Sequence, residues 1–98
     1  MSHYAVVQLV PTNADALAEY RKDALSAVHK HGGSAFAGGP ESIVLEDGGA
    51  GATTVLIVRF PDAKAGQAWI DDPDLAALHA LRNKGAKSTI VLLPELAG

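Results

Sequence analysis

The sequence TTVLIVRF at Thr53–Phe60 is the clearest strand signal in the chain, because β-branched and aromatic residues follow one another almost without interruption. Two shorter extended pieces precede it, at Ser34–Ala37 and Ser42–Glu46, with Gly38–Glu41 (GGPE) between them. Glycine and proline inside a strand indicate a bulge or a local break, usually on an edge strand. The turn Asp47–Gly51 (DGGAG) then predicts that these pieces form a β-hairpin with Thr53–Phe60.

Two further strands are predicted near the ends of the chain. His3–Val10 (HYAVVQLV) is closed by Pro11, and Ser88–Leu93 (STIVLL) is closed by Pro94. His3–Val10 is apolar at odd and even positions alike, which indicates a central strand that is covered on both faces.

A first helix is predicted over Ala14–His31, after an N-cap at Thr12 or Asn13. Gly32-Gly33 supplies the stop. At about 100° per residue, one stripe of this helix is expected to face the core. The stripe consists of Leu17, Ala24, Leu25 and Val28.

A second helix is predicted to begin at Pro61-Asp62 and to run to about Asp71. It restarts at Asp72-Pro73-Asp74, where Asp72 is expected to cap the new turn. Pro73 occupies the first helical position, which tolerates proline because its amide needs no partner there.

The order of elements is therefore β-α-β-β-α-β, which predicts an α+β fold of the ferredoxin-like type. Residues 1–98 form one such domain, with a four-stranded antiparallel sheet and both helices on one side. The other side of the sheet carries apolar side chains and would be bare. We therefore predict a homodimer in which two sheets pack face to face.

Composition excludes several classes of function. The chain has 98 residues, no cysteine, and 8 basic against 11 acidic residues, a net charge of -3. This balance argues against nucleic acid and membrane partners, which need a basic surface. Neither a leader peptide nor a spanning segment is recognisable, so a cytoplasmic protein is expected. We find no cofactor fingerprint and no metal site, since the rings of His29 and His31 point about 200° apart on a helix.

Several residue groups resemble a bacterial family by their order and approximate spacing along nearly the whole chain. They are Tyr20-Arg21, His31-Gly32-Gly33, Phe60-Pro61, Ala68-Trp69, Asp72-Pro73 and Arg82. The family is the domain of unknown function numbered 1330. The resemblance implies a ferredoxin-like subunit of a dimeric α/β barrel and implies no established activity. Ile70 and Leu75 depart from the pattern, because family members commonly carry aromatic residues there.

Two arginines are predicted to face the sheet. Helical projection places Arg21 in the apolar stripe between Leu17 and Leu25. Arg82 shares one side of the second helix with Leu75, Leu78 and His79. Inward guanidinium groups would receive a carboxylate or enolate oxygen of a bound molecule. Alternatively, Arg21 forms an internal ion pair with Glu46 or another acid, and Arg82 neutralises the end of its helix.

The remaining candidates are His31, Tyr20 and Trp69. His31 is a candidate general acid or base, or else part of the helix stop. It lies on the same side of the helix as Tyr20, roughly 16 Å further along the axis, so the two cannot act as one dyad. Trp69 is expected to pack in the core, with a pocket wall as the alternative. We predict that Tyr20, Trp69 and Glu46 line the pocket. Its catalytic groups are predicted to be Arg21, Arg82 and His31.

Three functions are compatible with this pattern. The first is an enzyme that transforms a small organic acid or enolisable compound between helices and sheet, without a cofactor. The second is a module that binds such a compound without turnover. The third is a dimer in which the arginines pair with acids and no ligand is bound. The sequence leaves open which of the three applies.

Overall fold

The computed structural model describes residues 1–39, 41–49, 51 and 53–97. Of the predicted break at Gly38–Glu41 and the predicted turn at Asp47–Gly51, Pro40 and Ala50 lie outside the described residues.

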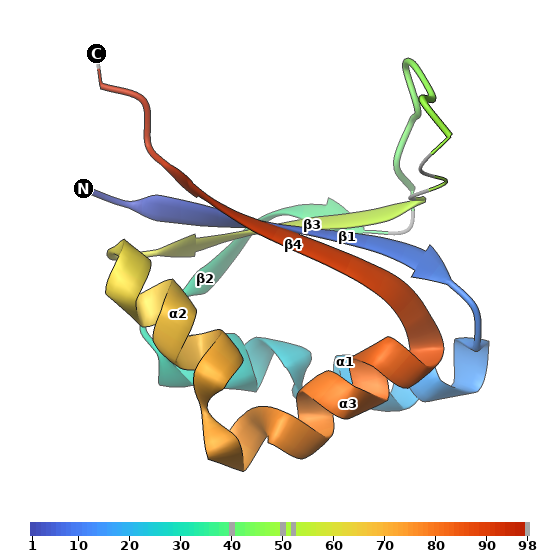
Figure 1. Cartoon of the computed structure of the whole chain (residues 1–98), viewed down its shortest axis with the longest axis horizontal. Helices are drawn as coiled ribbons and strands as arrows, with labels where there is room; N and C mark the ends of the chain where they lie inside the picture. Colours follow the sequence, from blue (N-terminus) through green and yellow to red (C-terminus); the bar gives the residue numbers. More distant parts are fainter. Residues whose placement is uncertain (40, 50, 52, 98) are drawn as a thin grey trace.

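Four strands and three helices alternate along the chain in the predicted order (Figure 1). They are β1 (His3–Pro11), α1 (Ala14–Lys30), β2 (Ser34–Gly39), β3 (Thr54–Phe60), α2 (Ala63–Asp71), α3 (Ala76–Gly85) and β4 (Ala86–Pro94). A 3-10 turn, η1 (Pro73–Leu75), joins α2 to α3, so the predicted restart of the second helix is confirmed. Within the described ranges, none of the helices combines the length and hydropathy needed to cross a membrane.

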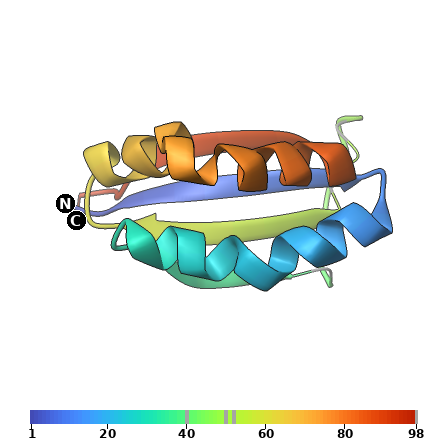
Figure 2. The same cartoon turned by 90° about the horizontal axis from the view of Figure 1, so that it is seen from below.

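The strands form one antiparallel sheet in the order β2-β3-β1-β4. The helices all cover the same face of this sheet, with α1 and α3 side by side in front of it (Figure 2). This is the predicted ferredoxin-like α+β fold, with β1 as a central strand between β3 and β4.

The edge strand β2 is shorter than predicted. Its pairing with β3 shifts between Ala35 and Ala37, whereas the bulge or break was predicted at Gly38–Glu41, and Gly38 and Gly39 still pair with β3. The second extended piece, Ser42–Glu46, is not a strand, and that prediction is wrong. Gly38 and Gly39 at the end of β2 have φ angles of 144° and 141°, which divert the chain from the sheet.

Polar side chains cap α1, α2 and η1, whereas α3 follows Leu75 without a side-chain cap. Asn13 accepts a hydrogen bond from the amide of Ala16 at 3.1 Å and so caps α1. Asp62 caps α2 through the amide of Ala65, and Asp72 caps η1 through the amide of Asp74. These bonds satisfy amides that have no partner inside the helix.

The core lies between the helices and the covered face of the sheet. Its largest fully buried side chains are Phe60, Leu17 and Val58. On β1, burial alternates with the period of a strand, since Ala5, Val7 and Leu9 face the helices.

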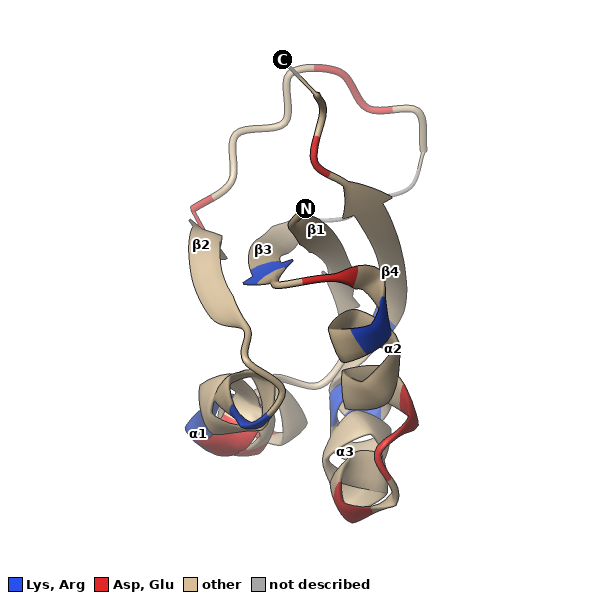
Figure 3. Cartoon of the chain, turned by 90° about the vertical axis from the view of Figure 1, so that its left-hand side faces the viewer, with Lys and Arg blue, Asp and Glu red and all other residues tan. Residues whose placement is uncertain are grey.

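The other face of the sheet is open and apolar. β1 and β2 carry no Asp, Glu, Lys or Arg, and β3 and β4 carry one such residue each, Arg59 and Lys87 (Figure 3). Phe36, Val91 and Leu93 are exposed there by 65%, 43% and 45%. The segment between β2 and β3 and the C-terminal end both rise on this side (Figure 1).

Candidate functional site

Helix α3 turns two polar side chains into the core. His79 and Arg82 lie three residues apart, on neighbouring turns, and are exposed by only 8% and 3%. The predicted inward orientation of Arg82 is therefore confirmed.

A chain of hydrogen bonds holds the Arg82 guanidinium. Its Nη1 donates to Nδ1 of His79 at 2.8 Å, and Nε2 of His79 lies 2.9 Å from the carbonyl oxygen of Trp69. Because a carbonyl can only accept, Nε2 carries the imidazole proton and His79 is neutral. Burial lowers the pKa of His79, the hydrogen bond to Trp69 opposes this, and the Arg82 charge lowers the pKa further.

The charge of Arg82 has no acidic partner in the described part of the chain. The ion pairs found there join Lys22 to Glu19, Lys30 to Asp72 and Asp74, and His31 to Asp72. The ring of Tyr20 lies 5.8 Å from the Arg82 Cζ atom, a cation–π distance. Nε of Arg82 is buried and has no hydrogen-bond partner among the residues that the structure describes. An unpaired cation thus stands in the core beside an aromatic ring.

Arg21 does not join this group. It is exposed, so the prediction that it faces the sheet is wrong. The buried face of α1 runs through Tyr20, Ala27 and Val28 and lies to one side of the predicted stripe, and Leu25 is 44% exposed. Small alanines and a tyrosine, rather than the large aliphatic residues alone, form the face that packs against α3 and the sheet.

The predicted ion pair between Arg21 and Glu46 is not formed, and this prediction is also wrong. Glu46 is exposed and lines a pocket of about 260 Å³ together with Gln8 and Val55. Gln8 and Val55 alternate with the helix-facing residues of their strands, so this pocket lies at the open face of the sheet. Glu46 and Arg21 therefore lie in different layers.

At the C-terminal end of α1, His31 is paired with an acid of the segment that joins α2 to η1. Its Nε2 lies 2.8 Å from Oδ2 of Asp72, and Nζ of Lys30 lies 2.8 Å from the same oxygen. The hydrogen bonds from Lys30 and then from His31 hold the pKa of Asp72 far below its usual range. The group fastens the end of α1 to η1. Along the axis of α1, His31 is separated from Tyr20 by roughly 16 Å.

Trp69 packs in the core, as predicted, and also lines a small cavity. Its ring lies 5.7 Å from that of Phe60 and meets the ring of His79 edge-on at 5.3 Å. The cavity has a volume of about 170 Å³ and lies between α2 and the sheet. Its lining residues are Ala5, Gly66, Gln67, Trp69, Ile70, Ile90 and Leu92.

Two residues of this region were not predicted as site residues. His79 was recognised only as part of a helix face, although its position three residues before Arg82 is the spacing of side-chain contacts on a helix. Ser88 on β4 has a buried Oγ that finds no hydrogen-bond partner within residues 1–39, 41–49, 51 and 53–97. The strand pattern around Ser88 gives no sequence signal that its hydroxyl is buried in this way.

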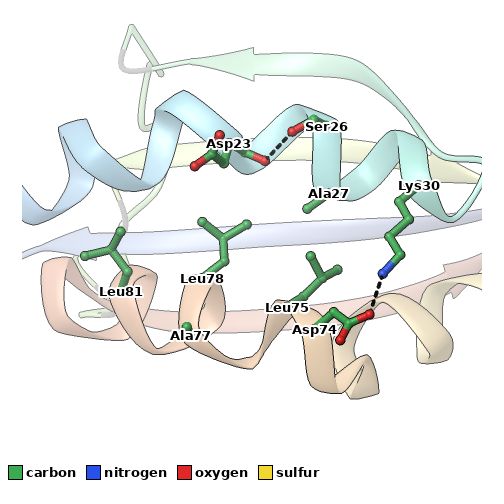
Figure 4. A pocket seen from close by; sticks show the side chains of 9 residues that line it. All are labelled: Asp23, Ser26, Ala27, Lys30, Asp74, Leu75, Ala77, Leu78 and Leu81. Carbon is green, nitrogen blue, oxygen red and sulfur yellow. Dashed lines mark hydrogen bonds and ion pairs between the residues drawn. The ribbon is translucent and has the colours of Figure 1, made fainter.

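A larger groove of about 520 Å³ runs between α1 and α3 (Figure 4). Leu75, Leu78 and Leu81 point into it from the α3 side. Its one cationic side chain, Lys30, reaches across to Asp74 at 3.4 Å. Among the described residues, no cluster of three His, Asp or Glu side chains is suited to a metal ion.

Solved structures share this fold at low sequence identity. A protein of unknown function from Rhodopseudomonas palustris is 21% identical, with a TM-score of 0.73 over 99% of this chain and 84% of that one. A dimeric ferredoxin-like protein of unknown function from Jannaschia sp. CCS1 is 17% identical, with a TM-score of 0.77 over 97% and 100%. SnoaB, a cofactor-independent oxygenase from Streptomyces nogalater, is 11% identical, with a TM-score of 0.61 over 99% and 93%.

Among curated proteins, no sequence matches the chain significantly. A family model does match, over residues 2–96, and its description is a domain of unknown function. The match spans nearly the whole domain, including the segments that hold Arg82, His79 and Trp69. The chain therefore belongs to the family DUF1330.

Proposed function

We propose that the protein binds a small organic anion between the helices and the sheet, and that Arg82 receives its charge. One observation carries this proposal: Arg82 is 3% exposed and has no acidic partner in the described part of the chain. A buried charge without a partner is strongly unfavourable. An anion that reached Arg82 would remove this penalty, and the low dielectric of the core would strengthen the attraction.

His79 supports the same function by holding Arg82 in place. As a neutral acceptor it adds no charge, so the pair presents a single positive charge to the ligand. Because its Nε2 is fixed by the carbonyl oxygen of Trp69, the imidazole ring cannot turn away without breaking a buried hydrogen bond.

We propose that the protein binds the anion at Arg82 and that His31 does not transfer a proton to or from it. Both ring nitrogens of His79 are already hydrogen-bonded. His31 is hydrogen-bonded to Asp72 at the C-terminal end of α1, roughly 16 Å from Tyr20 along the helix axis, and makes no hydrogen bond to Arg82 or His79. The likeness to a cofactor-independent oxygenase extends to the fold at 11% identity and supports no reaction in this chain.

We also propose that the protein is a homodimer through the open face of its sheet. Phe36, Val91 and Leu93 are exposed on this face, and large exposed apolar surfaces mark interaction sites. The similar protein from Jannaschia is described as dimeric, which supports a second copy as the partner. The anion site lies on the other side of the sheet, among residues of one subunit.

Isothermal titration calorimetry with benzoate tests the binding function. We expect wild-type protein to bind benzoate saturably and Arg82→Met to show no binding. Arg21→Met is the matched control, because it removes an exposed arginine from the neighbouring helix and should bind as wild type does. Equal binding by wild type and Arg82→Met would overturn the proposal, and so would the absence of binding by wild type to any of several small carboxylates.

A further inference from the structure

We infer that the ligand is a monocarboxylate with a short apolar body, whose carboxylate lies on Arg82 and Ser88 and whose body enters the cavity beside Trp69. This inference rests on the proposed function. It adds the chemical class of the ligand and a second polar group, and it follows from three features of the structure.

The first feature is the free edge of the guanidinium. Nη1 is occupied by His79, whereas Nε has no partner in the described part of the chain. By the covalent geometry of arginine, the Nε–H bond and one N–H bond of Nη2 point in parallel along the edge away from Nη1. Two parallel donors match the two oxygens of a carboxylate, which is planar and accepts from both. The side-on edge therefore favours a carboxylate over a spherical anion.

The second feature is the unpartnered hydroxyl of Ser88. Helix α3 passes directly into β4 at Gly85, with Arg82 three residues before this corner and Ser88 three residues after it. On β4 the residues with even numbers are the less exposed ones and face the helices, so Ser88 faces the layer that holds Arg82. Its buried Oγ has no hydrogen-bond partner in the part of the chain that the structure describes. Two buried polar groups without partners in the described part of the chain thus lie on either side of the turn from α3 to β4, six residues apart in the sequence, and we infer that one carboxylate accepts from both.

The third feature is the cavity further along the same strand face. Ile90 and Leu92 follow Ser88 on the helix-facing side of β4, and both line the cavity of about 170 Å³. Gln67 and the indole N–H of Trp69 supply the polar groups of its lining side chains, and none of the lining residues is charged. Cavities for drug-sized ligands have roughly 300–1,000 Å³, so this one admits only a small body.

These features select among small acids. We call Arg82 and Ser88 together the polar corner. A short branched or aromatic monocarboxylate, such as isovalerate or benzoate, can accept hydrogen bonds from the polar corner and also fill the apolar cavity. A dicarboxylate such as succinate would place its second charge among apolar side chains, which is unfavourable. Acetate satisfies the polar corner but leaves the cavity unused.

The inference is tested by calorimetric titration of the full chain with acetate, isovalerate, benzoate, succinate and inorganic phosphate. We expect isovalerate or benzoate to bind at least about tenfold more tightly than acetate and succinate, because burial of each methylene adds affinity. Arg82→Lys keeps the charge but loses the fork, so we expect it to weaken benzoate binding by about tenfold or more.

Two further variants separate the polar corner from the cavity. Ser88→Ala should weaken binding of all carboxylates several-fold, whereas Thr89→Ala, its exposed neighbour on the other face, should not. Ile90→Phe fills the cavity, and we expect it to remove the advantage of benzoate over acetate while acetate still binds. If either variant fails to fold by circular dichroism, the ligand series on wild type and the remaining variant decides.

Each outcome has a distinct meaning. If acetate, succinate and phosphate bind as tightly as benzoate, and Arg82→Met abolishes binding, the ligand class inferred here is wrong and the proposed anion site stands. If Arg82→Lys binds benzoate as tightly as wild type does, the inferred paired contact of the carboxylate with Arg82 is wrong. If Ser88→Ala does so, the inferred contact with Ser88 is wrong. If none of the probes binds to wild type, both the ligand class and the proposed function are overturned.

Discussion

Arg82 donates a hydrogen bond of 2.8 Å to Nδ1 of His79, so a buried cation rests on a neutral imidazole instead of a carboxylate. A core that only needed stability would pair this guanidinium with an acid or replace it with an apolar residue. The bond to His79 instead leaves the positive charge of Arg82 available to a ligand and fixes the orientation of the guanidinium. Its consequences for stability and binding can be measured separately.

Replacing Arg82 by methionine should raise stability while abolishing anion binding. The substitution removes an unpaired buried charge and retains apolar volume, so we expect the free energy of unfolding to rise by about 1–3 kcal/mol. Urea denaturation measures it, with Arg21→Met as the control whose stability should change by less than about 0.5 kcal/mol. A marked loss of stability in Arg82→Met would show that the guanidinium is structural.

His79 makes stability depend on pH in a defined direction. Its pKa is lowered in the fold from an ordinary value of 6.5, chiefly by burial, so the unfolded chain binds the proton more readily. The neutral form contributes stability fully above pH 6.5, and this contribution is lost as the pH falls from 6.5 toward the lowered pKa. We therefore expect the Tm to fall over this window.

The control for this pH dependence is His79→Gln, which keeps a polar side chain but cannot titrate. Its Tm should change less between pH 7 and pH 5 than that of wild type. The charge of Arg82 and the more distant charge of Asp72 act on His79 with opposite signs, and both persist over this range. An identical slope in His79→Gln and wild type would assign the effect to other groups.

His31 gives a prediction that separates binding from catalysis. Since His31 contacts Asp72 and not the Arg82 region, we expect His31→Gln to bind benzoate with unchanged affinity. Calorimetry checks this directly. A loss of affinity of tenfold or more would show that His31 belongs to the binding site. If wild type consumed a benzoate-like acid and His31→Gln did not, this would establish turnover.

Asp72 should matter more for stability than an ordinary helix cap. It caps η1 and also accepts hydrogen bonds from Lys30 and His31, whereas Asp62 only caps α2. We expect Asp72→Ala to lower the Tm more than Asp62→Ala does, in differential scanning calorimetry at neutral pH. Equal effects of the two substitutions would mean that the contacts to α1 add nothing beyond the cap.

The open face of the sheet predicts a dimer that a charge can break. Leu93→Glu places a carboxylate on the apolar surface and should yield a monomer by light scattering. Leu25→Glu is the matched control, because Leu25 on α1 is 44% exposed and Leu93 is 45% exposed. Wild-type protein that is monomeric at micromolar concentration, or a dimeric Leu93→Glu variant, contradicts the proposed interface.

The fold was predictable because its signals are local. Caps at Asn13, Asp62 and Asp72 and the β-branched run of β3 each act within a few residues. The edge strand was less predictable. Ser42–Glu46 has the composition of a strand, but β2 ends at Gly39, where glycine φ angles turn the chain away from the sheet.

The site was predictable only in part, because it depends on tertiary contacts. Arg82 was placed correctly, since its helix face is marked by large aliphatic residues on the same side. Arg21 was misplaced because α1 buries Ala16, Tyr20 and Ala27 together with Leu17 and Val28, and the first three weigh little in a pattern based on large aliphatic side chains. The contact between His31 and Asp72 joins residues 41 positions apart, a distance at which no helical spacing gives a signal.

The most direct measurement is nuclear magnetic resonance of the arginine Nε–H groups during titration with benzoate. Arg21, Arg59 and Arg82 are the three arginines, so each signal can be assigned by substitution. We predict that the Arg82 Nε–H resonance shifts with a saturable curve while those of Arg21 and Arg59 stay in place. An Arg82 signal that does not move, or three signals that drift together without saturation, would contradict an anion site at Arg82.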